Sequence, residues 1–282
     1  MNEDRSKQSE GWHFSEGDVV VPALLALRLL GGGERYETYL AYDERRLALV
    51  VVKVLRPHLV SDAHSLRGLA REIGLLERLA HPVIVRAFAS ETGGERPHVV
   101  LEHLEGPRLS SLLRRYGPLD GEQLLPLGAQ LGSAAHYLAG EGVVHLDIKP
   151  SNIIMGAPAR LIDLSIARIQ DALRRHDRPI GTDAYMPPEQ CDPVGRGPIT
   201  AAADVWGIGS TLHHAALGRA TFAVQATPGA EPDERYPQLV RPPEPLPASL
   251  PDALRDLILD CLAADPDKRP LAAEDEIRRA HV

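Results

Sequence analysis

The sequence predicts an α+β fold in which a small β-rich part precedes a larger, mainly helical part. In the first third of the chain, apolar residues come mostly in short runs separated by turn residues, which is typical of antiparallel strands. After Gly106, leucines and alanines recur at three- and four-residue steps, which is typical of helices. The two parts meet near Glu102–Gly106. We therefore expect a loose tail over residues 1–15, one lobe over residues 16–102 and a second over residues 103–282.

Three apolar runs open the first lobe, at residues 23–30, 36–42 and 47–55. The breaks between them, Gly31–Gly33 and Asp43–Arg46, contain residues that favour turns. Two turns between three strand-like runs predict an antiparallel meander.

A helix follows the meander, and two more strand-like runs at residues 84–88 and 98–101 complete the lobe. The predicted helix ends at His81-Pro82, because proline does not continue a helix. Its apolar face consists of Leu66, Leu69, Ile73, Leu76 and Leu79.

The second lobe reads as a series of helices. Asp120 with Gln123 three residues later predicts a capping box that opens a helix toward Ala139. Residues 201–217 and 252–263 also have a helical pattern. The stretch 228–251 holds eight prolines, and we interpret it as an extended surface connection.

Composition excludes several classes of protein. With 44% hydrophobic and 25% charged residues in 282, the chain is ordinary for a globular protein. A formal charge of −8 argues against a nucleic-acid partner. The polar N-terminus lacks the apolar segment of a signal peptide, and the longest uncharged run of the first part, Val19–Leu27, is too short to span a membrane, so we expect a cytoplasmic protein. Cys191 and Cys261 lack the spacing of a zinc site.

The segment His145–Asn152 carries the strongest chemical signal, together with Asp163. Phosphoryl transfer needs a base that orients a hydroxyl, a cation on the phosphate and oxygen ligands for Mg²⁺. Asp147, Lys149, Asn152 and Asp163 supply those groups.

At these residues the chain resembles the eukaryotic-type (Hanks-type) Ser/Thr protein kinase family, and in particular its bacterial members. HLDIKPSN stands at the catalytic loop, DLS at the DFG position and VVVK at the VAIK position. Further matching segments, in family order, are GTDAYMPPE, DVWGIG, DPDKRP and the partly matching glycine-rich segment LGGG.

The resemblance implies the two-lobed protein-kinase fold, with ATP and Mg²⁺ or Mn²⁺ in the cleft. Lys53 would hold the phosphates and pair with Glu72, Asp147 would orient the hydroxyl, and Lys149 would steady the γ-phosphate. The metal would be bound by Asn152 and Asp163. The nucleotide would be surrounded by Gly31, Gly33, Val51, Lys53, Glu102, Leu104 and Ile154. The acceptor would enter near Thr182, and Glu189 would pair with Arg269.

Lysine usage supports these assignments independently of the family. The chain has only four lysines among 31 basic residues, and two of them are Lys53 and Lys149. Lysine is a compact, flexible charge that a planar guanidinium does not replace. Chance placement of a few lysines is the alternative explanation.

Several residues depart from the family pattern, among them Val51 at the alanine of VAIK and Leu164 at the phenylalanine of DFG, and three of them bear on activity. Tyr36 replaces the third glycine of the phosphate loop, and Ser165 replaces the glycine of DFG. Leu146 replaces the arginine that in many relatives binds an activation-loop phosphate. Residues 166–180 contain no Ser, Thr or Tyr, so we expect activity without phosphorylation in that segment.

The expected function is ATP-dependent phosphorylation of Ser/Thr hydroxyls on protein substrates in bacterial signalling. The main alternative is a pseudokinase that binds nucleotide or acts as a scaffold, which the three departures favour. A small-molecule phosphotransferase of related fold is a third reading, against which the segments after Gly181 argue. A homodimer remains an open possibility.

Overall fold

The computed structural model of the chain describes residues 11–222 and 231–270. These residues form two compact units. The first extends to Ala80 and includes Val85–Leu104, and the second comprises His81–Ile84 and continues from Glu105. The sequence placed His81–Ile84 in the first lobe, and its exact domain bounds stay a prediction.

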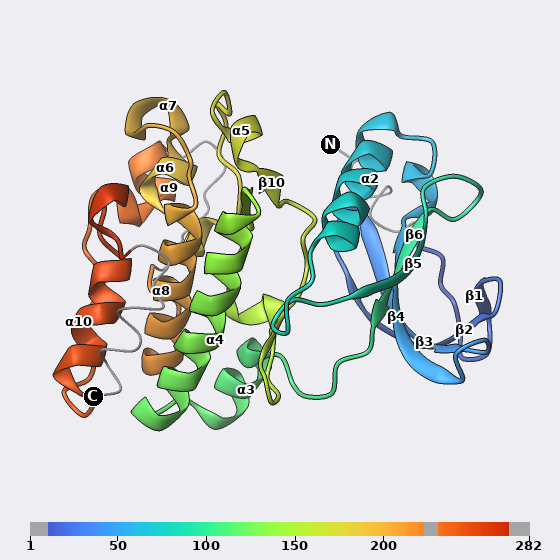
Figure 1. Cartoon of the computed structure of the whole chain (residues 1–282), viewed down its shortest axis with the longest axis horizontal. Coiled ribbons are helices and arrows are strands. Elements are labelled where there is room, and N and C mark those ends of the chain that lie inside the picture. The colour runs from blue at the N-terminus through green and yellow to red at the C-terminus, as the bar shows by residue number, and fades with distance from the viewer. Residues whose placement is uncertain (1–10, 223–230, 271–282) are drawn as a thin grey trace. The chain divides into compact units, whose positions relative to one another are not determined.

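The first unit is built on a six-stranded antiparallel sheet in the order β1-β2-β3-β4-β6-β5 (Figure 1). The central hairpins match the predicted meander. The strands are β1 (Val19–Val21), β2 (Leu24–Gly32), β3 (Tyr36–Asp43), β4 (Ala48–Leu55), β5 (Ala87–Glu91) and β6 (His98–Glu102).

The two faces of β4 have different roles, because successive side chains of a strand point to opposite sides. Val50, Val52 and Val54 are fully buried in the apolar core of the first unit. Val51 and Lys53 therefore lie on the other face of the strand.

Helix α2 (Ala63–Arg78) confirms the predicted helix of the first unit and follows the short 3₁₀ turn η1 (Pro57–Leu59). Its N-terminus is capped by Asp62, whose side chain accepts a 2.7 Å hydrogen bond from the Ser65 amide. The buried side of the helix carries Leu69 and Ile73, and between them the carboxylate of Glu72.

The segment before β1 corrects the predicted tail over residues 1–15. Trp12 and Phe14 pack against the apolar core of the first unit, and the Phe14 ring meets Tyr39 edge-on at 5.3 Å. Residues 1–10 lie outside the described residues. Aromatic burial on the sheet thus outweighs the polar composition around these two residues.

Strand β5 begins three residues later than the sequence predicted. Ile84 instead forms a bridge to Leu161, and the Val83 carbonyl accepts a 2.6 Å hydrogen bond from the Leu161 amide. The sequence predicts a strand that already includes Ile84 and Val85, because an apolar pattern alone does not show which partner a segment has.

The second unit is mainly helical, and α4, α8 and α10 lie side by side in it (Figure 1). The helices are α3 (Leu109–Tyr116), α4 (Gly121–Gly140), α5 (Gln170–Leu173), α6 (Pro188–Cys191), α7 (Pro193–Arg196), α8 (Ala202–Leu217), α9 (Pro232–Arg235) and α10 (Asp252–Cys261). The short strands are β7 (Val143–Val144), β8 (Ile153–Ile154), β9 (Arg160–Leu161) and β10 (Arg168–Ile169). The 3₁₀ turns are η2 (Pro150–Asn152), η3 (Asp183–Tyr185), η4 (Pro237–Leu239) and η5 (Pro266–Lys268).

Local sequence signals explain the main helices. The predicted capping box is present at the start of α4, where the side chains of Asp120 and Gln123 each accept a hydrogen bond from the other residue's backbone amide. Helix α8 is buried on nearly all sides, as expected for the central helix of a helical layer. None of the helices among the described residues combines the length and the apolar character that crossing a bilayer requires.

The proline-rich stretch is not simply a surface connection. Tyr236 and Gln238 are buried, and the Gln238 amide donates to the carbonyls of Asp183 at 2.6 Å and Met186 at 3.0 Å. Residues 228–230 lie outside the described residues. Side-chain hydrogen bonds hold this segment against the residues after Gly181.

Candidate active site

Lys53 and Glu72 form a buried ion pair in the first unit. The Lys53 ammonium lies 2.7 Å from Oε1 of Glu72, and the two residues are 7% and 1% exposed. Strand β4 and helix α2 hold the two side chains. A buried charge is tolerated only when it is paired, so these two residues require each other.

Tyr36 adds a contact that the sequence did not predict. Its ring lies 4.6 Å from the Lys53 ammonium, and the residue is only 8% exposed. This distance is within cation–π range. The residue that replaces the third glycine therefore covers the lysine instead of extending into solvent.

The glycine-rich turn joins β2 to β3 and is tightly built. Gly31 has a φ of 143°, a conformation that side chains disfavour. A Cβ on Gly32 would lie 2.6 Å from the Tyr36 carbonyl oxygen. The three glycines thus allow a close turn, in which the Gly33 amide donates to the Tyr36 carbonyl at 3.2 Å.

The remaining predicted nucleotide residues of the first unit lie on neighbouring strands. Val51 is paired with Leu101, and Glu102 is paired with Val50 across β4 and β6. Leu104 follows two residues after the end of β6. Ile154 belongs to the second unit, in β8.

In the second unit, Asp147 is the centre of a polar cluster. Its Oδ1 accepts a 2.6 Å hydrogen bond from the Thr182 hydroxyl, and its Oδ2 accepts a 2.9 Å bond from the Asn152 amide. The Lys149 ammonium lies 2.7 Å from Oδ2 and donates to the Thr182 hydroxyl at 2.5 Å. Four predicted residues are thereby brought together.

The β8–β9 hairpin sets the position of Asn152 relative to Asp163. Asn152 immediately precedes β8, and Asp163 follows β9 by two residues. The Ile162 amide donates to the Asn152 carbonyl at 2.8 Å, which extends the ladder beyond the strands. Asp163 has a φ of 71°, and its Oδ1 accepts a 3.2 Å bond from the Ser165 amide.

Glu189 and Arg269, which are 80 residues apart, form a buried two-point pair. The guanidinium nitrogens donate to the two carboxylate oxygens at 2.6 and 2.8 Å. Arg269 also donates to the Ala202 carbonyl at 2.9 Å. This pair ties the segment after Thr182 to the end of the second unit.

Comparison with known proteins identifies the fold. The protein kinase domain family matches residues 25–276. The chain belongs to the protein kinase domain family.

Similar proteins within this family come from bacteria. Serine/threonine-protein kinase PkaA of Streptomyces coelicolor is 36% identical over 230 residues, which are 79% of this chain and 41% of PkaA. Probable serine/threonine-protein kinase PkwA of Thermomonospora curvata is 34% identical over 248 residues, 87% of this chain and 32% of PkwA.

Serine/threonine-protein kinase PknB of Mycobacterium leprae is 31% identical over 256 residues, 86% of this chain and 40% of PknB. The chain thus spans about two fifths of these relatives' length or less.

Two residues of this kinase domain support the catalytic segment without having been assigned that role from the sequence. The Asp204 carboxylate accepts hydrogen bonds from the backbone amides of His145 and Leu146, at 2.7 and 2.9 Å. The side-chain amide of Gln190 donates to the Leu146 carbonyl at 3.0 Å. Leu146 has a φ of 69°, which is costly for a branched side chain. These bonds hold that backbone conformation, and burial raises the pKa of Asp204. The DVWGIG segment was the only sequence signal.

Leu146 lies in an apolar cluster instead of pairing with an anion. It is buried with Val144 and Leu173, and the partly buried Ile166 and Ile180 pack against the cluster. Three of these side chains, Ile166, Leu173 and Ile180, belong to the segment that lacks phosphorylatable residues. Apolar packing therefore holds that segment.

The donor set of the second unit fits a hard divalent cation. The side-chain amide of Asn152 donates both of its protons to Asp147, one to the backbone carbonyl and one to the carboxylate. The side-chain oxygen Oδ1 of Asn152 is therefore left as a ligand atom. Asp163 supplies carboxylate oxygens. Carboxylate and amide oxygens are the ligands that Mg²⁺ prefers.

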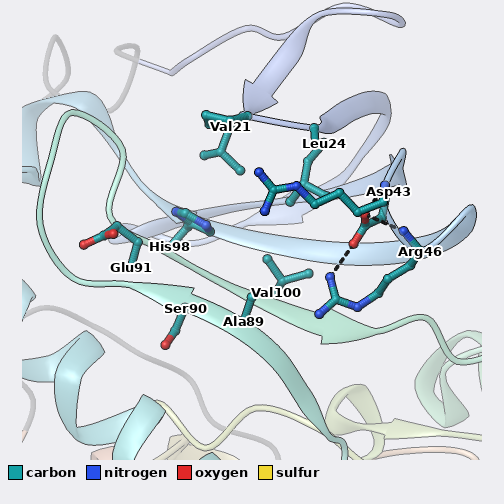
Figure 2. Close-up of a pocket in the computed structure, with 12 residues that line it drawn as sticks. Val21, Leu24, Asp43, Arg46, Ala89, Ser90, Glu91, His98 and Val100 are labelled. Atoms are coloured by element: carbon teal, nitrogen blue, oxygen red, sulfur yellow. Dashed lines mark hydrogen bonds and ion pairs between the residues drawn. The ribbon is translucent and has the colours of Figure 1, made fainter.

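A pocket of about 210 Å³ lies elsewhere on the first unit (Figure 2). Its wall includes Asp43 and Arg46, which form a 2.6 Å ion pair, and His98 and Glu91 lie on the other side. None of the predicted site residues is among those that line it. It is distinct from the residues discussed above.

Proposed function

We propose that the chain transfers the γ-phosphate of ATP to serine or threonine hydroxyls of protein substrates. One observation carries this proposal. Asp147 accepts a hydrogen bond from a threonine hydroxyl while Lys149 donates to the same oxygen. A substrate hydroxyl at that position would be oriented by a carboxylate and would lie beside a cation.

The contacts of the residues support the following proposed roles. Asp147 accepts the proton of the attacking hydroxyl and orients its oxygen. The Lys149 ammonium contacts both Asp147 and the Thr182 hydroxyl, and it neutralises negative charge on the transferred phosphoryl group. Lys53, held by Glu72, provides the cation for the other phosphates of the nucleotide. The glycine-rich turn with Gly31 and Gly33 would lie against them, because its glycines carry no side chains that keep a phosphate away.

A divalent cation held by Asn152 and Asp163 would neutralise charge on the phosphates when it is bound. The donor set does not distinguish Mg²⁺ from Mn²⁺, because both accept oxygen ligands.

The pseudokinase alternative is favoured by the Tyr36 ring, which lies over the cation that would hold the phosphates. The complete set of polar contacts around Asp147 favours the enzyme. A scaffold has no need of a buried lysine, its paired glutamate and a carboxylate that accepts a hydroxyl.

We further propose that activity does not require phosphorylation within residues 166–180. The apolar cluster around Leu146 supports this, because it gives the segment a packed position without a phosphate. The bacterial relatives favour a role in bacterial signalling, and a homodimer is compatible with it.

The proposal is tested by following label from γ-labelled ATP with Mg²⁺ into a generic protein acceptor and into the chain itself. Phosphoserine and phosphothreonine should be the products, and Lys53→Met should abolish the transfer. Binding of ATP without transfer by the wild-type chain would support the scaffold. Label in small molecules alone would support the third reading.

A further inference from the structure

Glu37 is a buried carboxylate outside the groups so far assigned a function. It lies on β3, one residue after Tyr36, and is 4% exposed. Such a group needs partners, because an unpaired buried carboxylate is very costly. Its partners come from two directions, one before the sheet and one after β4.

The first direction is the segment before β1. The Trp12 backbone amide donates to Oε2 of Glu37 at 3.1 Å, and the Tyr39 hydroxyl donates to the same oxygen at 2.6 Å. Burial and this hydrogen bond raise the pKa of Tyr39, so the phenol remains a donor. A Cβ on Gly11 would lie 2.3 Å from Oε1 of Glu37. The chain passes directly over the carboxylate.

The aromatic side chains of this segment are fixed independently. The Trp12 indole N–H donates to the Leu55 carbonyl at 2.7 Å, and its ring stacks on Phe14. The Arg96 guanidinium lies 5.2 Å and 5.0 Å from the two ring centres. The segment Gly11–Phe14 is therefore a rigid partner for Glu37.

The second direction leads to the glycine-rich turn. Nη1 of Arg56 lies 3.0 Å from Oε1 of Glu37, and its Nε donates to the Gly33 carbonyl at 2.9 Å. The Arg56 amide also donates to the Arg35 carbonyl at 2.9 Å. One planar guanidinium thus joins the buried carboxylate to the turn, a geometry that lysine cannot reproduce.

We propose that Glu37 and Arg56 are positioning residues through which the segment Gly11–Phe14 holds the glycine-rich turn in the conformation that binds ATP. This inference rests on the proposed function. The order of contacts is Trp12 to Glu37, Glu37 to Arg56, and Arg56 to Gly33. Residues before the sheet therefore set the affinity for the nucleotide without touching it.

Population arithmetic gives the size of the effect. If the turn adopts the binding conformation only a tenth of the time, the apparent dissociation constant rises about tenfold. The catalytic groups of the second unit are unaffected once ATP is bound. The Michaelis constant for ATP should therefore rise while kcat stays nearly constant.

Glu37→Gln is the main test variant, because the amide would turn an N–H toward the Arg56 guanidinium while its oxygen can still accept from Tyr39. Trp12→Phe is a milder second variant that keeps an aromatic ring and removes the indole N–H. Arg46→Gln is the matched control, since it removes a 2.6 Å ion pair of the same sheet at Asp43, the other end of β3.

The measurements are titration of the full chain with Mg·ATP, steady-state kinetics, and hydrogen exchange at the Arg56 amide. We expect Glu37→Gln to raise the dissociation constant and the Michaelis constant about five- to tenfold. It should change kcat less than twofold and accelerate exchange at Arg56. Trp12→Phe should raise the dissociation constant, the Michaelis constant and the exchange rate by smaller amounts. If Glu37→Gln does not fold, the Trp12→Phe variant is used to test the inference.

Unchanged ATP affinity in both test variants, or an equal loss in Arg46→Gln, would overturn the inference and leave the proposed function in place. Failure of the wild-type chain to bind Mg·ATP would reject the inference and the nucleotide-dependent function together. The two failures are distinguished by the wild-type titration alone.

Discussion

Leu146 shows how one residue changes the chemistry around it. Where an arginine would need an anion, the leucine packs against Leu173, Ile166 and Ile180. The cation beside the Asp147 carboxylate is then Lys149 and not a residue at position 146, and the following segment is held by burial. The position of the segment becomes a property of the unmodified sequence, which is what the proposed phosphorylation-independent activity requires.

Restoring the arginine should be destructive. Leu146→Arg buries a cation in an apolar cluster with no carboxylate in it, and we expect a loss of about 2–4 kcal/mol in the free energy of unfolding. Leu146→Met should cost less than about 1.5 kcal/mol, because it keeps the volume. Chemical denaturation measures both. Equal stability of the Arg variant and the wild type would show that the cluster contributes no constraint.

Phosphatase treatment should leave the activity unchanged within about twofold, since the segment 166–180 offers no hydroxyl to phosphorylate. Thr182→Glu should lower turnover, because it places a carboxylate beside Asp147 at 2.6 Å contact distance. Steady-state kinetics with mass mapping tests both statements. A rise in turnover for Thr182→Glu would contradict phosphorylation-independent activity.

The buried pair between Glu189 and Arg269 should matter far more than a surface pair. Glu189→Gln leaves the Arg269 charge uncompensated, which costs about 3–5 kcal/mol and lowers the melting temperature by about 10 °C. Asp171→Asn removes the exposed pair with Arg174, whose side chains are 83% and 75% exposed, and is the control. Similar melting temperatures for the two variants would refute this difference.

At the scale of elements, the sequence patterns predicted the bounds of a helix or strand correctly where its packing partners are local. Helix α4 begins at its capping box, and α2 ends before His81-Pro82. The predictions for the segment around Trp12 and for the start of the strand at Ile84 were wrong, because the partners of both segments are distant in sequence. Local signals thus predict where elements begin, while long-range partners decide which segments are ordered.

Helix α8 carries two histidines that should make the stability depend on pH. Burial lowers the pKa of His213 and of His214. Nε2 of His213 donates to the Glu244 carbonyl at 2.8 Å, while its Nδ1 is buried with no partner among the described residues. A proton on Nδ1 would therefore be buried without an acceptor.

The direction in which stability changes with pH follows from the number of protons that the folded and the unfolded states bind. Unfolded histidine titrates near 6.5, so below that pH the unfolded state binds more protons and stability falls. We expect the free energy of unfolding to fall between pH 7.5 and 5.5, with the fully buried His213 as the main contributor. His213→Gln keeps the donor to Glu244 and should flatten the profile, whereas His58→Gln, at an exposed position, should not. Parallel profiles for all three proteins would contradict this account.

At the scale of the molecule, the sequence predicted the α+β class and most elements, because strand and helix periodicities are strong in this chain. It also predicted the residues that gather around Asp147: Lys149 and Asn152 are close to it in sequence, whereas Thr182, 35 residues away, followed from the family resemblance. The support from Asp204 and Gln190 was not predictable from spacing, as both lie more than 40 residues from Leu146. The same holds for the path from Trp12 to Gly33.

The central claim is that Asp147 orients the acceptor hydroxyl in a working enzyme. The most direct measurement compares wild type and Asp147→Asn for Mg·ATP affinity and for turnover on one acceptor. The amide keeps the shape and removes the charge. We predict dissociation constants within about twofold and a fall in kcat of at least about 100-fold. Equal turnover of the two proteins, or ATP binding without transfer by either, would contradict the claim.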